Sequence, residues 1–129
     1  MRIMGFQRQW VNQLTGKPKL SEEEFTTFRW PRRDRDWVVD ETVQIVMNPR
    51  TKERIPQGEA IIVSKEPRTI INANPNFYTE TPHITDSEAQ MDGFLLAIYL
   101  IDFLIQGKPR HWIYPVNRLT LRWTRRYND

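Results

Sequence analysis

Apolar and polar residues alternate in two stretches of the chain, which is the pattern of a half-buried strand. Three other short stretches are rich in aromatic and β-branched residues, which favour strands, and a fourth is compact and mostly apolar. Turn-forming residues separate most of these stretches, so we expect several short strands. The predicted strands are Phe25–Trp30, Thr42–Asn48, Glu59–Ser64, Thr69–Asn72, Arg110–Tyr114 and Arg118–Thr124.

Two segments instead repeat apolar residues every three or four positions, which predicts helices. Four apolar residues between Phe6 and Leu14 fall on one helical face, and Gly16 follows as the expected C-cap. A longer helix is expected from Thr85, which begins a sequence with the spacing of a capping box, to about Gln106. Residues 72–85 between the strands and this helix are expected to form a loop, long enough to be functional or mobile.

The order of elements predicts an α+β fold in one domain spanning residues 1–129. Strands are short and dominate, and helices do not alternate with them, so a doubly wound parallel sheet is not expected. The pattern favours a small mixed β-barrel or curled sheet. One N-terminal helix and one long helix before the last strand pair would lie at its edges.

Composition excludes several kinds of chemistry. The 129 residues contain no Cys, which rules out disulfides, thiol nucleophiles and Cys-ligated zinc, and two His are a poor metal inventory. Five isolated Gly form no phosphate-binding loop, so no metal or cofactor is expected. The longest apolar run is too short to cross a membrane, and no secretory signal precedes it. We expect a cytoplasmic protein that binds no membrane.

The formal net charge is only +3, but the charges are segregated along the chain. Residues 29–36 hold four Arg, the C-terminal residues 108–129 hold six basic side chains, and residues 79–102 hold five acidic side chains without a Lys or Arg. Arg presents a planar fork that suits phosphate and stacks on bases. The candidate nucleic-acid-binding residues are Arg29, Arg32, Arg33, Arg35, Arg50, Lys52 and Arg122.

An ordered series of short motifs resembles the ASCH domains, which belong to the PUA-like superfamily of small β-barrels. The resemblance covers roughly Phe6 to Trp123. It departs from the family pattern at Val39-Asp40-Glu41, which lacks the usual Gly before the Asp. The motifs are Phe25-Thr26-Thr27-Phe28-Arg29, Pro31-Arg32-Arg33, Val43-Gln44-Ile45-Val46, Gly58-Glu59-Ala60-Ile61-Ile62-Val63 and Asp92-Gly93-Phe94.

The resemblance implies a cleft beside the barrel that binds RNA or modified nucleotides. Some ASCH proteins are small amidohydrolases that remove the acetyl group from acetylated cytidine, using a Lys, a Thr and a Glu, and others are reported as ribonucleases. Thr27 matches the family Thr, and Asp92 stands where the family has Glu. The family Lys falls on Glu24, so a Lys from the longer preceding loop, Lys17 or Lys19, would have to take its place.

Three functions remain open at this point. The first is a module that binds RNA or a nucleotide-like ligand, with Arg29 facing the cleft to bind phosphate or to pair with Asp92. The second is a metal-independent hydrolase with Thr27, Asp92 and Lys19 as catalytic residues, because a Thr hydroxyl needs a base beside it. The third is an interaction protein that forms oligomers. The residues considered for stacking on a base are Trp30, Trp37 and Tyr78.

Overall fold

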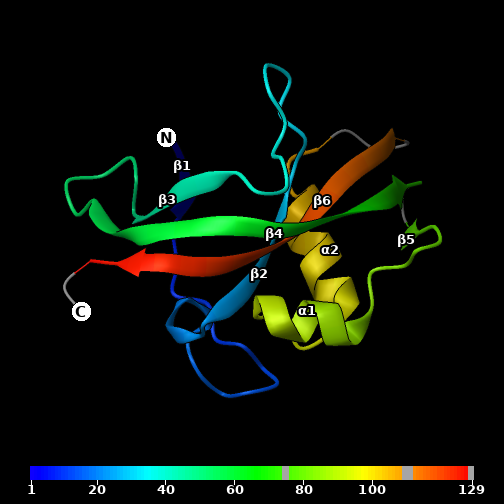
Figure 1. Ribbon diagram of the computed structural model, residues 1–129. Coiled ribbons are helices and arrows are strands. Elements are labelled where there is room, and N and C mark those ends of the chain that lie inside the picture. The colour runs from blue at the N-terminus through cyan, green and yellow to red at the C-terminus, as the bar shows by residue number, and fades with distance from the viewer. Residues whose placement is uncertain (74–75, 109–111, 128–129) are drawn as a thin grey trace.

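Strands outnumber helices in the computed structural model, which describes residues 1–73, 76–108 and 112–127 (Figure 1). The six strands of these residues form one sheet, and two helices and a short 3-10 turn, η1, connect them. The fold is therefore mixed α+β, as the sequence predicts. In chain order the elements are β1 (Arg2–Phe6), η1 (Lys19–Ser21), β2 (Glu24–Arg29), β3 (Thr42–Met47), β4 (Ile55–Asn72), β5 (Phe77–Thr79), α1 (Asp86–Asp92), α2 (Ala97–Ile105) and β6 (Trp112–Arg126).

The long strands β4 and β6 lie at the centre of the sheet and pair antiparallel over most of their length. Each is a single strand where the sequence predicts two, because the residues between the predicted strands continue the same pairing, with Glu66 opposite Arg118 and Pro67 opposite Asn117. Residues 109–111, where one of the predicted strands begins, lie outside the described residues. The strand order is β1-β3-β4-β6-β2, with β1 parallel to β3, and β5 pairs with the end of β4.

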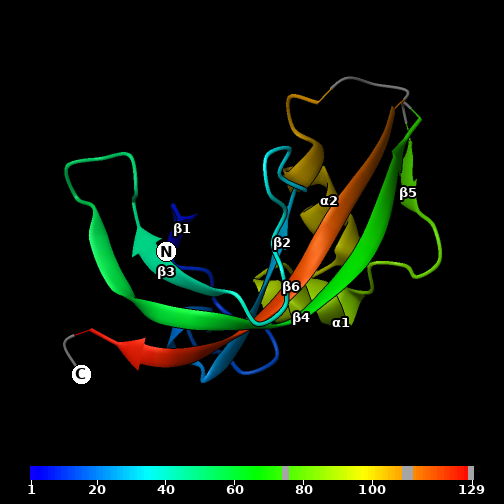
Figure 2. The same cartoon turned by 45° about the horizontal axis from the view of Figure 1, so that its top comes forward.

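Each face of the sheet packs against its own hydrophobic core. Side chains of a strand alternate between the two faces, so Phe25 of β2 lies in the first core and Phe28 lies in the second. In β4, Ile62 and Ile70 are eight residues apart, so a regular strand would put both side chains on the same face of the sheet. They lie in different cores because a bulge just after Ile62 shifts the alternation. Figure 2 shows β4 and β6 curving from β1 and β3 at one end to the helices at the other.

The helix predicted between Phe6 and Leu14 is wrong. Residues Arg2–Phe6 form the edge strand β1, and the Phe6 ring is buried in the first core. Val11 and Leu14 are exposed, so the apolar face of the expected helix has nothing to pack against. Gly16 does not cap a helix but closes a turn, where its N–H donates to a carbonyl four residues earlier.

The long helix predicted from Thr85 is divided into α1 and α2. Its start is confirmed, because the Thr85 hydroxyl accepts a hydrogen bond from the Glu88 N–H at 3.1 Å. α1 ends at Asp92 because Gly93 adopts a left-handed conformation with φ of 112° and donates its N–H back to two α1 carbonyls. Neither helix of the described residues is long and apolar enough to cross a membrane.

The sheet curls without closing into the barrel that the sequence predicts. β1 and β2 are the two ends of the strand order, and no backbone pairing between them is seen in the described residues. A side chain joins them instead, since Arg29 Nη2 donates to the Gly5 carbonyl at 2.8 Å. The opening between these two edge strands is where the candidate site lies.

Candidate functional site

A cavity of about 340 Å³ opens between the edge strands β1 and β2, beside the two helices. Its volume is in the range of pockets that hold small ligands. We call it the Lys19 pocket. The polar side chains that concern us come from η1, β2 and the last residue of α1, and the aromatic side chains come from β1, β2, α2 and the loops. The polar lining residues used below are Lys19, Thr27, Arg29 and Asp92, and the aromatic ones are Phe6, Trp10, Phe28, Trp30, Phe94 and Phe103.

Lys19 and Asp92 form an ion pair in the lining of the pocket. Lys19 Nζ lies 2.5 Å from Asp92 Oδ1, and the side chains are only 3% and 8% exposed. The same amine donates to the Thr26 carbonyl of β2 at 2.8 Å. The loop before η1 sets this position, because the Lys19 N–H donates to the Trp10 carbonyl. The three side chains predicted as catalytic, Lys19, Thr27 and Asp92, are thus brought to one pocket, and their catalytic role stays a prediction.

Burial favours the neutral form of both members of this pair. It lowers the pKa of the Lys19 ammonium and raises the pKa of the Asp92 carboxyl. The attraction between the two groups opposes both shifts, and Arg29 adds to it at Asp92. Lys19 therefore holds its proton less firmly than in water, and Asp92 binds a proton more firmly. The proton affinities of the two groups lie closer together than in water, and groups with such shifted pKa values are typical of functional sites.

Arg29 connects the two edge strands beside the pocket. Its Nε donates to Thr27 Oγ1 at 3.1 Å, and its guanidinium lies 4.6 Å from the centre of the Phe6 ring. Burial lowers the pKa of Arg29 to about 10, so the side chain stays charged at neutral pH. Because Arg29 donates to the Thr27 oxygen, the Thr27 hydroxyl keeps its own proton for another acceptor. Arg29 makes no ion pair with Asp92 in the described residues, although it attracts that carboxylate.

Aromatic rings form a wall of the pocket that the sequence did not identify. Trp10 lies 4.8 Å from Phe94 and 5.5 Å from Phe103, measured between ring centres. The sequence pattern puts Trp10 on a helix that does not form, and Phe103 on a long helix that the structure divides into α1 and α2. The signal that could have found them is Gly93, because a Gly beside Phe94 permits the close approach of another ring.

The residues considered for stacking on a base have different positions. Trp30 lines the Lys19 pocket and packs against Tyr114, with ring centres 5.7 Å apart. Trp37 is buried in the first core, and Tyr78 is exposed and lines a different cavity. The described part of residues 72–85 contributes no side chain to the Lys19 pocket, so it does not form a lid over it.

Only part of the predicted basic set gathers beside this pocket. Arg29, Arg32 and Arg50 line an adjoining hollow of about 400 Å³, which we call the Arg32 groove. The other predicted basic residues are exposed and line neither hollow; they are Arg33, Arg35, Lys52 and Arg122. One of them, Arg35, pairs with Glu41, with Nη2 lying 3.4 Å from Glu41 Oε2. In the described residues, no group of three or more acidic or His side chains is placed to hold a metal ion.

The chain matches no family model, no curated protein and no solved structure. The function of the Lys19 pocket therefore has to be inferred from its own residues and from the sequence motifs that line it.

Proposed function

We propose that the Lys19 pocket binds the base of an RNA or nucleotide-like ligand, in a chain related to the ASCH domains. The observation that carries this proposal is the placing of Lys19–Asp92 and Thr27–Arg29 side by side in a pocket with aromatic walls. The Thr–x–Arg strand and the Asp92-Gly93-Phe94 motif, both part of the ASCH resemblance, supply much of this lining.

The chemistry of the lining suits a base. The aromatic rings offer flat faces for stacking, which is worth about 1–3 kcal/mol per base. The Thr27 hydroxyl and the Lys19 amine can donate hydrogen bonds, and Asp92 can accept them, so the edge of the base can be distinguished. Arg29 remains charged and adds attraction for an anionic ligand.

Calorimetric titration with the four common ribonucleosides and acetylated cytidine tests this proposal. Thr27→Val removes the hydroxyl at nearly constant volume, and we expect it to weaken binding by roughly tenfold or more, because a polar group of the ligand loses its partner. Arg122→Ala is the matched control, since Arg122 is exposed and lines neither hollow. Absence of binding by every compound, or equal binding by Thr27→Val, contradicts the proposal.

A second candidate function is hydrolysis of an acyl group on a nucleoside, and the position of Lys19 favours it. In this reaction the Lys19–Asp92 pair takes the proton of Thr27 Oγ1, and that oxygen attacks the amide carbonyl. The C–N bond then breaks, the amine of the base leaves with a proton, and an acyl ester remains on Thr27. Water hydrolyses the ester and releases the free acid. Arg29, which already contacts Thr27, is placed to stabilise the oxyanion.

The hydrolase proposal is tested by chromatography of acetylated cytidine after incubation with the purified protein. We expect cytidine and acetate to appear, Thr27→Ala to abolish their formation, and Thr27→Ser to retain part of it because the hydroxyl is kept. The absence of deacetylation by the unmodified chain, or full activity in Thr27→Ala, argues against catalysis. Binding without turnover then leaves the first proposal in place.

A further inference from the structure

The Arg32 groove and the Lys19 pocket lie next to each other. Gly5, Gln7 and Arg29 line both hollows, so a ligand that fills the pocket and passes Arg29 enters the groove. At this point a side-chain hydrogen bond from Arg29 to the Gly5 carbonyl joins β1 and β2. The two hollows can therefore hold two parts of one molecule.

The groove offers guanidinium groups whose charge is little used within the protein. Arg50 is exposed and forms no ion pair among the described residues. In the described part of the chain Arg32 pairs only with Asp34, at 3.6 Å, and both side chains are exposed. Such surface pairs contribute about 0–1 kcal/mol, so an anion can replace Asp34 at small cost. Arg29 remains protonated at the junction with the pocket.

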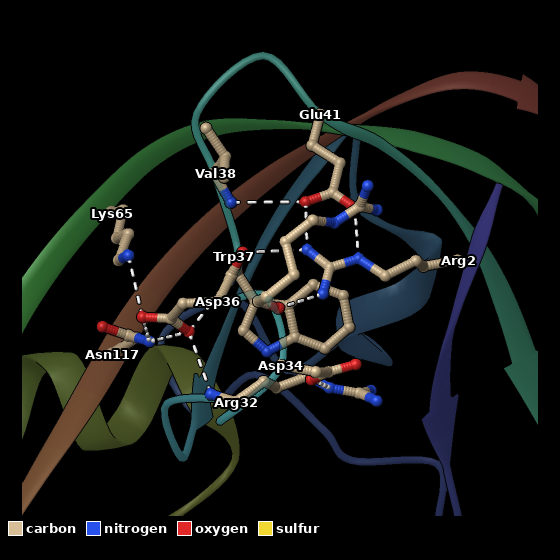
Figure 3. A network of polar contacts seen from close by, with 10 residues as sticks. Arg2, Arg32, Asp34, Asp36, Trp37, Val38, Glu41, Lys65 and Asn117 are labelled. Carbon is tan, nitrogen blue, oxygen red and sulfur yellow. Dashed lines mark hydrogen bonds and ion pairs between the residues drawn. The ribbon is translucent and has the colours of Figure 1, made fainter.

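The loop that carries Arg32 is held in place by a network of polar contacts (Figure 3). The Asp36 carboxylate accepts from the backbone N–H groups of Arg32, at 3.2 Å, and Trp37, at 2.8 Å. Lys65 and Asn117, from β4 and β6, donate to the same carboxylate at 2.9 and 3.0 Å. Arg32 therefore stands at the groove on a fixed backbone, with its guanidinium 5.6 Å from the centre of the Trp37 ring. A site that is fixed before binding loses less entropy when a ligand arrives.

Two other carboxylates of this segment, Asp36 and Glu41, have basic partners on neighbouring elements. Glu41 pairs with Arg2 at 2.5 Å and lies 3.4 Å from Arg35, and Asp36 pairs with Lys65. Arg2 also donates from Nη2 to the Asp36 carbonyl at 3.0 Å, which ties the loop to β1. The charge that remains at the groove is therefore positive.

We infer that the Arg32 groove binds a phosphate group of the same ligand whose base lies in the Lys19 pocket. This inference rests on the proposed function, and it specifies the ligand as a nucleotide or an RNA segment and not a free nucleoside. Arg is the residue best suited to this task, because its fork can donate two parallel hydrogen bonds to phosphate oxygens.

The test compares binding of ribonucleosides, their monophosphates, a short single-stranded RNA and pyrophosphate alone, by calorimetry at low salt. We expect a monophosphate to bind at least about tenfold tighter than its nucleoside, and Arg32→Ala/Arg50→Ala to abolish that preference. The control is Arg33→Ala/Arg122→Ala, which removes the same charge from exposed residues that line neither hollow. Tighter binding of the RNA than of any monophosphate would identify RNA as the source of the phosphate.

The outcomes separate this inference from the proposed function. Equal binding of nucleoside and monophosphate, a preference that survives in Arg32→Ala/Arg50→Ala, or an equal loss in the control overturns the phosphate site while the base pocket stands. If no nucleoside or nucleotide binds, the proposed function fails. Pyrophosphate binding then tests whether the Arg32 groove is an anion site by itself. Saturable pyrophosphate binding that Arg32→Ala/Arg50→Ala loses and the control keeps supports an anion site. If pyrophosphate does not bind, the anion site is overturned together with the proposed function.

Discussion

Lys19 and Asp92 come from segments 73 residues apart and meet with both charges buried. Removing two charges from water costs several kcal/mol for each ion, and their attraction does not always repay that cost. Well-packed apolar residues would hold η1 against α1 at least as firmly. The pair is therefore better explained by the chemistry of the pocket it lines than by stability.

This reasoning predicts an asymmetry between single and double substitutions. We expect Lys19→Met to lower the free energy of unfolding by about 3–5 kcal/mol, because it leaves the Asp92 carboxylate buried without its cation. Lys19→Met/Asp92→Leu removes both charges and should recover most of that loss. Urea denaturation near neutral pH measures both variants. A double variant as unstable as the sum of the two single ones would show that the ion pair itself holds the fold together.

The polar residues of the site could be predicted from the sequence to different degrees. Thr27 and Arg29 lie on a strand whose aromatic and β-branched composition is visible locally, so their place was found. Lys19 was reached only through the ASCH resemblance and the length of the preceding loop. Trp10 and Phe103 were missed, because they meet through a tertiary contact that has no counterpart in local periodicity.

At the scale of elements, the end of α1 determines where the aromatic wall stands. A Cβ on Gly93 would lie 3.0 Å from the Trp10 Cβ and 3.2 Å from its ring, at a φ of 112° that side chains rarely adopt. We expect Gly93→Ala to destabilise the fold by roughly 1–3 kcal/mol and to weaken nucleoside binding, because Trp10 must move. Denaturation and calorimetry measure the two effects.

Gly16 provides a matched control for that substitution. Its φ of 74° is also left-handed, but a Cβ there would have no neighbour within 4 Å. Gly16→Ala should therefore lose stability through backbone strain and leave nucleoside affinity unchanged. If both variants bind equally well, the contact between Gly93 and Trp10 does not shape the pocket.

The loop carrying Arg32 depends on the ionised form of Asp36. Burial alone would raise the pKa of this carboxyl, but hydrogen bonds from Lys65, the Trp37 N–H and Asn117 outweigh it and lower the pKa to about 2. Since the carboxyl is ionised more readily in the folded chain than in the unfolded one, its stabilising effect is complete above the unfolded pKa of 3.8. It is lost as the pH falls toward 2.

We therefore expect Asp36→Asn to be less stable than the unmodified chain by about 1–2 kcal/mol near neutral pH, allowing for partial solvent screening. The difference should shrink as the pH falls from about 4 to about 2. Urea denaturation at several pH values measures it. Asp34→Asn, in the same loop but mostly exposed, should change stability little. A difference for Asp36→Asn that persists at the lowest pH contradicts the assignment of the shift to this network.

The strands were predictable where their apolar pattern is local, and β1 shows where that fails. β3 was found because its buried and exposed residues alternate. β1 is an edge strand of five residues whose parallel partner begins at Thr42, far along the chain. Its last residue, Phe6, also fits a helical spacing with Trp10, Val11 and Leu14, and only the tertiary fold decides between the two patterns.

At the scale of the whole molecule, the segregation of charge seen in the sequence is partly used to build the fold. Several acidic side chains of residues 79–102 have partners: Glu88 pairs with Arg68 at 2.7 Å and Asp92 with Lys19. Basic residues of β6 are also engaged, since Arg118 pairs with Glu66 at 2.7 Å. The acidic segment is therefore not simply a free acidic surface. Positive charge remains available at the Arg32 groove.

This distribution predicts how RNA binding depends on salt. Each phosphate neutralised on a single strand contributes about −0.7 to the slope of log K against log salt concentration. On an RNA segment, contacts from Arg29, Arg32 and Arg50 to three successive phosphates would give a slope of roughly −2, or about a 20-fold loss of affinity between ~50 and ~200 mM salt. Arg32→Ala/Arg50→Ala should reduce the slope to roughly −0.7, whereas nucleoside binding, which neutralises no phosphate, should be almost independent of salt.

Fluorescence anisotropy of a labelled RNA measures the slopes. A slope that the groove variant leaves unchanged would place the phosphate contacts on another surface.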